Sequence, residues 1–271
     1  MRIPPDVSEW LNLVARWFHV FAGILWVGST YYFTWLDGRF NEAEKAAGSK
    51  DGAAVWMVHS GGFYVVNKKQ TPGARELHWF RWEAALTWLS GVVLLVLLYY
   101  LGGGMVDVDV RDISVRTAVL FGVGMILAGG VVYDLLVQSP LGRNEKAFAA
   151  VAYALVVGAA YLATHVLSGR AAFLHVGAMF GTIMVANVWM HILPAQRRMI
   201  AAARGGRAPD ARDAARAKLR SKHNTFMAVP VVFTMISNHY PVSTYGHQHN
   251  WLILSALVLA GWAAAKIIRR A

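Results

Sequence analysis

The sequence predicts an all-α membrane protein, a polytopic helical bundle with about seven transmembrane helices. Three observations lead to this prediction. Of the 271 residues, 56% are hydrophobic and only 15% are charged, a composition typical of polytopic membrane proteins rather than soluble domains. Long apolar stretches recur along the chain, and the basic residues lie mainly between them. We therefore expect residues 1–271 to form a single transmembrane domain.

Seven stretches are long enough and apolar enough to cross a bilayer as helices. We predict spans at about Ser8–Leu36, Trp79–Leu101, Val115–Val137, Ala147–Leu167, Ala171–Leu193, Asn224–His239 and Trp251–Ile268. The sixth is short and contains Pro230. A proline is tolerated in such a helix where neighbouring groups satisfy the carbonyl that it leaves unpaired.

The basic residues predict the orientation of the bundle. Most of the 26 lysines and arginines follow the first, third, fifth and seventh spans, which places the N-terminus outside and the C-terminus in the cytoplasm. This orientation accounts for the net charge of +11, so the expected partner is the lipid bilayer and not a nucleic acid. Because the chain has no cysteine, disulfides, thiolate metal sites and covalently attached haem c are excluded.

Two of the expected cytoplasmic loops are long. The loop at 37–78 contains a short apolar piece, His59-Ser60-Gly61-Gly62-Phe63-Tyr64, which is too short to cross the bilayer and is expected to be re-entrant or interfacial. The loop at 194–222 is rich in alanine and arginine. We expect it to be helical and solvated, in contact with anionic lipid headgroups.

The fifth span carries two histidines, His175 and His191, and also Asn187. Polar groups are costly at this depth and therefore indicate a functional site. The two histidines are 16 residues apart, which corresponds to about 24 Å along a helix and to nearly opposite faces. They therefore cannot bind the same cofactor.

The remaining histidines fall at the same two depths. His223 and His239 in the sixth span are also 16 residues apart, so antiparallel packing would align each of them with one histidine of the fifth span. The outer tier then contains His19, His175 and His239, and the inner tier contains His78, His191 and His223. Two tiers are typical of a transmembrane cytochrome with two haems. The alternative is that the histidines near the span ends are interfacial, and that His191 belongs to a helix-packing seam with Gly177 and Gly181.

Three further polar side chains lie within or at the edge of the spans: Glu83, Asp134 and Asn187. Glu83 follows Arg81 near the expected cytoplasmic surface. It is either one partner of a structural ion pair or a carboxylate that accepts a proton. The sequence contains no Walker loop, no dinucleotide fingerprint and no serine nucleophile elbow, so nucleotide chemistry of the soluble type is not expected.

Motifs spread along nearly the whole chain resemble one known family. They are Arg16-Trp17-Phe18-His19-Val20 with Trp26-Val27-Gly28-Ser29, the 59–64 piece, Leu77-His78-Trp79-Phe80-Arg81-Trp82-Glu83-Ala84, Gly181-Thr182-Ile183-Met184 with Asn187-Val188, Pro194-Ala195-Gln196, His223-Asn224, and Met235-Ile236-Ser237-Asn238-His239-Tyr240-Pro241. In these segments the chain resembles the membrane domain of the urate hydroxylase (PuuD) family, also called the urate oxidase N-terminal domain.

The resemblance implies an enzyme of the bacterial inner membrane. Such an enzyme oxidises urate to 5-hydroxyisourate and passes the electrons to a cytochrome c without producing hydrogen peroxide. Typical members carry one more span and a C-terminal cytochrome c domain, and this sequence ends at Ala271 without them. A separate cytochrome c is therefore the expected acceptor, and a homo-oligomer is compatible with the sequence.

Together these readings give one functional hypothesis, in which one or two haems b carry electrons from urate. His19 and His175, with His239 as substitute, would bind the outer haem, and His78 with His223 or His191 would bind an inner one. Urate would bind near the cytoplasmic side, at His59, Tyr64, His78, Trp82 and Glu83. Two alternatives remain open: a membrane module that binds or transports haem or copper, and a cytochrome b subunit that has no substrate of its own.

Overall fold

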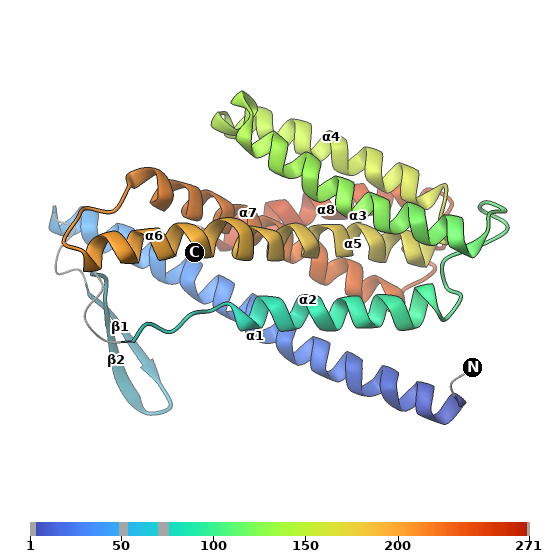
Figure 1. The fold of residues 1–271 in the computed structure, drawn as a ribbon, viewed down its shortest axis with the longest axis horizontal. Helices are drawn as coiled ribbons and strands as arrows, with labels where there is room; N and C mark the ends of the chain where they lie inside the picture. The colour runs from blue at the N-terminus through green and yellow to red at the C-terminus, as the bar shows by residue number, and fades with distance from the viewer. Residues whose placement is uncertain (1–3, 49–53, 70–75, 270–271) are drawn as a thin grey trace.

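The described part of the computed structural model, residues 4–48, 54–69 and 76–269, is a helical bundle with one β-hairpin (Figure 1). Its elements are α1 (Pro5–Ala47), β1 (Ala54–His59), β2 (Gly62–Asn67), α2 (Trp82–Leu95), the π-helix η1 (Val96–Tyr100), α3 (Val115–Gln138), the 3-10 turn η2 (Pro140–Arg143), α4 (Glu145–Thr164), α5 (Gly169–Ala186), the π-helix η3 (Asn187–Ile192), α6 (Leu193–Arg204), α7 (Ala211–Ile236), the 3-10 turn η4 (Ser237–His239) and α8 (Asn250–Ile268). The predicted helical bundle is confirmed.

Side chains at the helix starts explain several boundaries. Ser114, Asn144, Ser168 and Asp210 each accept a hydrogen bond from a backbone N–H in the first turn of the helix that follows. Such caps satisfy amide groups that have no partner inside the helix. The boundaries of α3, α4, α5 and α7 therefore follow from local sequence.

Helix α5 forms the centre of the bundle. In the most apolar 18 residues of the helical segment that contains it, 67% of the residues are buried. The buried share is 28% or less in the corresponding stretch of each of the other five described helices that are long and apolar enough to cross a membrane. It packs against α2, α3, α4 and α7, and Figure 1 shows it running through the middle of the bundle. The apolar side chains that the outer helices leave exposed are those expected to face lipid.

Six helical segments of the described residues are long and apolar enough to cross a membrane. They correspond to the predicted first to fifth spans and the seventh, although their boundaries differ. The predicted sixth span covers the end of α7 and η4, and α7 begins at Ala211 because Asp210 caps it there. Pro230 does not break this helix. Its ring packs against Gly261 of α8, where a Cβ atom would lie 2.9 Å from the Pro230 Cδ.

The loop expected at 37–78 contains a structure that was not predicted. Helix α1 continues to Ala47, and β1 and β2 then form an antiparallel hairpin. The 59–64 piece supplies the turn and half of β2. In Figure 1 the hairpin projects from the bundle at the end where α6 and the start of α7 lie. This end, which holds the arginine-rich segment, is called the inner end below, and the opposite one the outer end.

Candidate functional site

A group of polar side chains lies buried between three helices near the inner end. We call it the inner polar cluster. Its members are Tyr133 and Asp134 of α3, Asn187 and His191 of η3, and Arg220, His223 and Asn224 of α7. Arg220, Asn187 and Asn224 are each at most 4% exposed. Buried polar groups at this density need partners, and hydrogen bonds within the cluster supply most of them, although Arg220 Nε has none among the described residues.

The π-helix η3 is what positions two members of the cluster. It ends at Ile192, two residues before Pro194, which has no N–H and whose ring would clash with the carbonyl four residues earlier in a regular α-helix. The wider turn runs from Asn187 to Ile192 and so places Asn187 and His191 on a widened stretch of backbone. Short π-helical turns inside α-helices often occur at functional sites.

The donors and acceptors of the cluster can be assigned by starting from Arg220. Arg220 can only donate, and its Nη1 donates to Asn187 Oδ1 at 3.0 Å. The Asn187 amide nitrogen therefore points the other way, where it donates to Tyr133 Oη at 3.0 Å and to Asn224 Oδ1 at 2.9 Å. Asn224 in turn donates to the Met184 carbonyl at 3.0 Å. The orientations of both amide groups are thus determined.

Asp134 connects this network to His191. Its Oδ1 accepts from Arg220 Nη2 at 2.6 Å and lies 2.9 Å from His191 Nε2, while its Oδ2 accepts from Gln138 at 2.6 Å. A carboxylate that accepts the N–H of one ring nitrogen leaves the other nitrogen with its lone pair, as in the histidine of a catalytic triad. His191 therefore has the arrangement of a general base.

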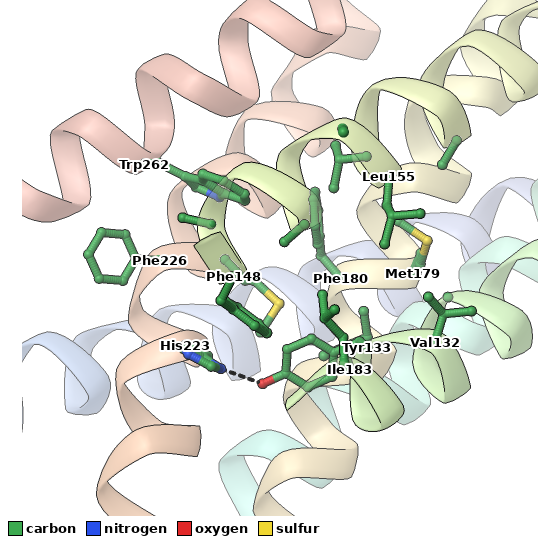
Figure 2. Close-up of a pocket in the computed structure, with 18 of the residues that line it drawn as sticks. Val132, Tyr133, Phe148, Leu155, Met179, Phe180, Ile183, His223, Phe226 and Trp262 are labelled. Carbon is green, nitrogen blue, oxygen red and sulfur yellow. Dashed lines mark hydrogen bonds between the residues drawn. The ribbon is translucent and has the colours of Figure 1, made fainter. Parts of the chain in front are cut away.

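His223 connects the cluster to a large cavity. Its Nδ1 lies 2.9 Å from Tyr133 Oη, and its ring stacks on Phe148 at 4.7 Å between centroids (Figure 2). The cavity has a volume of about 1230 Å³ and lies between α3, α4, α5, α7 and α8. Its walls are mostly apolar. Four cationic side chains and one carboxylate also line it: Lys146, Lys222, Lys266, Arg269 and Glu145.

The structure does not bring the two predicted outer ligands together. His19 packs against α2, with Nδ1 3.0 Å from the Thr87 carbonyl and 2.9 Å from Ser90 Oγ. His175 instead packs against α3. Its Nδ1 donates to the Ala171 carbonyl at 2.8 Å, and a Cβ atom added to Gly122 would lie 2.6 Å from its Nε2. Each imidazole thus fills a different contact between helices.

The other predicted site residues are dispersed. His78 and His239 are exposed, as are the hairpin residues His59 and Tyr64. Trp82 is exposed too, and its ring meets the edge of Trp189 in η3 at 6.0 Å. Glu83 has a buried Oε2 with no hydrogen-bond partner among the described residues. Within the part of the chain that the structure describes, no group of three or more His, Cys, Asp or Glu side chains is placed to hold a metal ion.

Sequence reasoning missed the central members of the cluster. Arg220 was grouped with the arginines of a solvated loop, because the helix start at Asp210 was not recognised. Asp134 was noted as a polar residue within a span but was given no partner. Asp134 lies near the inner end of the third predicted span, and Arg220 lies just before the sixth. The two could have been paired from the sequence, since opposite charges at equal depth favour contact.

Comparison with known proteins supports the resemblance noted in the sequence. Residues 5–270 match the family described as "Urate oxidase N-terminal". The comparisons find no match among curated proteins or among solved structures.

Proposed function

Because this chain belongs to the urate oxidase N-terminal family, we propose that it is a multi-pass membrane oxidoreductase that converts urate to 5-hydroxyisourate. The reaction removes two electrons and two protons while water supplies the added hydroxyl: urate + H₂O → 5-hydroxyisourate + 2 H⁺ + 2 e⁻. An enzyme for this reaction needs a base that accepts protons and a route for the electrons.

The arrangement of His191 is the observation that supports the proposal. Asp134 orients the ring through Nε2 at 2.9 Å, and Arg220 Nη2 donates to the same Asp134 oxygen at 2.6 Å. The free Nδ1 would accept a proton from urate or from the attacking water. General bases of this kind typically contribute about 10²–10⁴-fold to the rate. Trp82 and Glu83 extend the proposed site, because Trp82 contacts Trp189 two residues before His191.

We place haem b, the proposed cofactor, in the cavity beside His223 rather than between His19 and His175. Of the predicted ligands, His223 is the one that lines the cavity. The volume and apolar walls suit a macrocycle, and the four cations suit its propionates. Ligation through Nε2 requires Nδ1 to hold a proton and donate it to Tyr133. When bound, haem would take up electrons singly and pass them on.

The proposed electron acceptor is a separate cytochrome c, and the proposed location is the bacterial inner membrane. Both follow from the family resemblance. His19 and His175 would then be structural, since each has a hydrogen-bond partner on a neighbouring helix.

Steady-state kinetics of the purified protein with urate and cytochrome c test the proposed role of His191 as general base. His191→Gln should lower kcat by about 10²-fold or more and remove the limb of the pH profile that reports the base, with KM little changed. His165→Gln, at an exposed histidine after α4, is the control and should behave as wild type. Normal kcat in His191→Gln would rule out its role as base.

A reduced-minus-oxidised spectrum tests the cofactor. Gly124 lines the cavity and an added Cβ meets nothing there within 4 Å, so Gly124→Leu should place a side chain inside the cavity, obstruct the macrocycle and lower haem retention. Gly130 on the same helix has equal space but does not line the cavity, so Gly130→Leu should retain haem. Equal haem in both variants would refute this location, and haem that urate cannot reduce would indicate an electron-transfer subunit instead.

A further inference from the structure

The two faces of the β-hairpin have different surroundings. Residues paired across the strands share a face, and the face alternates along each strand. One face carries Val55 and Met57 and packs on α1. Val55 is buried against Leu36 and Phe40, and Met57 Sδ accepts a hydrogen bond from Tyr32 at 3.5 Å. This face is what holds the hairpin to the helix.

The opposite face is apolar and has no protein against it in the described structure. The pairs Trp56–Val65 and Val58–Phe63 form it, and we call it the apolar hairpin face. Its side chains are 73%, 45%, 69% and 83% exposed, in that order. A continuous exposed patch of large apolar side chains marks an interaction site.

The position of the hairpin along α1 indicates what covers this face. Its contacts with α1 run from Phe40 back to Tyr32, which lies at the inner end of the predicted first span. Beside Tyr32 on α1, Phe33 and Trp35 are also exposed. The apolar hairpin face therefore continues the lipid-facing surface of α1 at the depth of the inner headgroups.

Two further observations limit the depth. A two-stranded sheet has unpaired N–H and C=O groups along both outer edges, and hydrocarbon cannot satisfy them. At the base of the hairpin, Lys68 pairs with Asp37 at 3.7 Å and with Glu44 at 3.1 Å, which requires a polar environment. A re-entrant position within the hydrocarbon is thus disfavoured, and an interfacial one satisfies both constraints.

We propose that the hairpin is a membrane-surface anchor, with the apolar hairpin face resting on the acyl chains of the inner leaflet. The edges and the turn would lie among headgroups and water. Tryptophan is enriched at this depth because its ring is apolar and its N–H needs a polar partner, and Trp56 is the residue that would take this role.

The absence of native cysteines permits a direct test with single-cysteine variants carrying an environment-sensitive fluorophore. The probes are Trp56→Cys, Val58→Cys, Phe63→Cys and Val65→Cys, in nanodiscs that hold one protein copy each. Tyr64→Cys is the matched control, since Tyr64 is adjacent, lies on the other face and is 50% exposed, against 45% for Val65. Lipids carrying a nitroxide near the headgroup, and iodide in the buffer, serve as quenchers.

Lipid nitroxides should quench the four probes of the apolar hairpin face more than the Tyr64 probe, and iodide should show the reverse order. Emission from the four probes should also shift to shorter wavelengths when detergent is replaced by bilayer. Efficient iodide quenching of all five probes would overturn the proposal. Protection from both quenchers would also overturn it, because the face would then be covered by protein.

Discussion

Breaking the buried ion pair between Asp134 and Arg220 is the sharpest test of the inner polar cluster. The Arg220 side chain is 3% exposed, so Asp134→Asn would leave a buried guanidinium charge that faces neutral amide oxygens, that of Asn187 among them, in place of a carboxylate. Removing one partner of a fully buried pair costs about 3–5 kcal/mol, and because the Asp134 side chain is 34% exposed we expect the lower end, about 3 kcal/mol. At roughly 2–4 °C per kcal/mol, the loss corresponds to a fall of roughly 6–12 °C in melting temperature. Tryptophan fluorescence of the detergent-solubilised protein would measure it.

A double variant and a surface pair make this test specific. Asp134→Asn combined with Arg220→Met removes both charges and should recover most of the lost stability. Arg198 and Asp213 form a pair of equal length, 2.6 Å, but Arg198 is at the surface, so Arg198→Met should change the melting temperature little. If Asp134→Asn melts within about two degrees of wild type, the pair does not form in the folded protein and the network is wrong.

Two further predictions concern helix packing and the proposed cofactor. Gly177→Ala should destabilise the bundle by about 1–3 kcal/mol, because the added Cβ would overlap Thr234 Oγ1. Gly181→Ala on the same helix is the control: its Cβ would meet nothing within 4 Å, so the melting temperature should be unchanged or raised. Tyr133→Phe should weaken haem binding by about 10–100-fold in a haem titration, because it removes the partner of His223 Nδ1; unchanged affinity would argue against His223 as ligand.

The sequence predicted the helical bundle well because apolar spans are long and strongly patterned. It also singled out the polar residues of the fifth span, Ala171–Leu193, and the helical segment that contains this span is the most buried of the six candidates among the described residues. The hairpin was missed, since it lies in a loop whose residues alternate only weakly in polarity. Turn signals such as Ser60-Gly61, both with positive φ, were the one local cue.

The candidate site was only partly predictable. Spacing along one helix correctly separated His175 from His191, but pairing of histidines by depth alone ignored which helix each one faces. His175 faces α3, while His19 faces α2. Rotation of a helix about its axis depends on packing with its neighbours, and one sequence does not specify it. Gly91 of α2 is the glycine whose missing Cβ leaves room for His19.

The central position of α5 has a consequence for how the bundle is made. Four earlier helices leave the ribosome before α5 does, and three of them, α2, α3 and α4, pack on it. Because chains are synthesised from the N-terminus, those three helices must wait in the bilayer without the helix that they share as a partner. Assembly is thus a late event that follows the insertion of α5. A defect in α5 should expose nascent chains to quality control longer than an equal defect in α4.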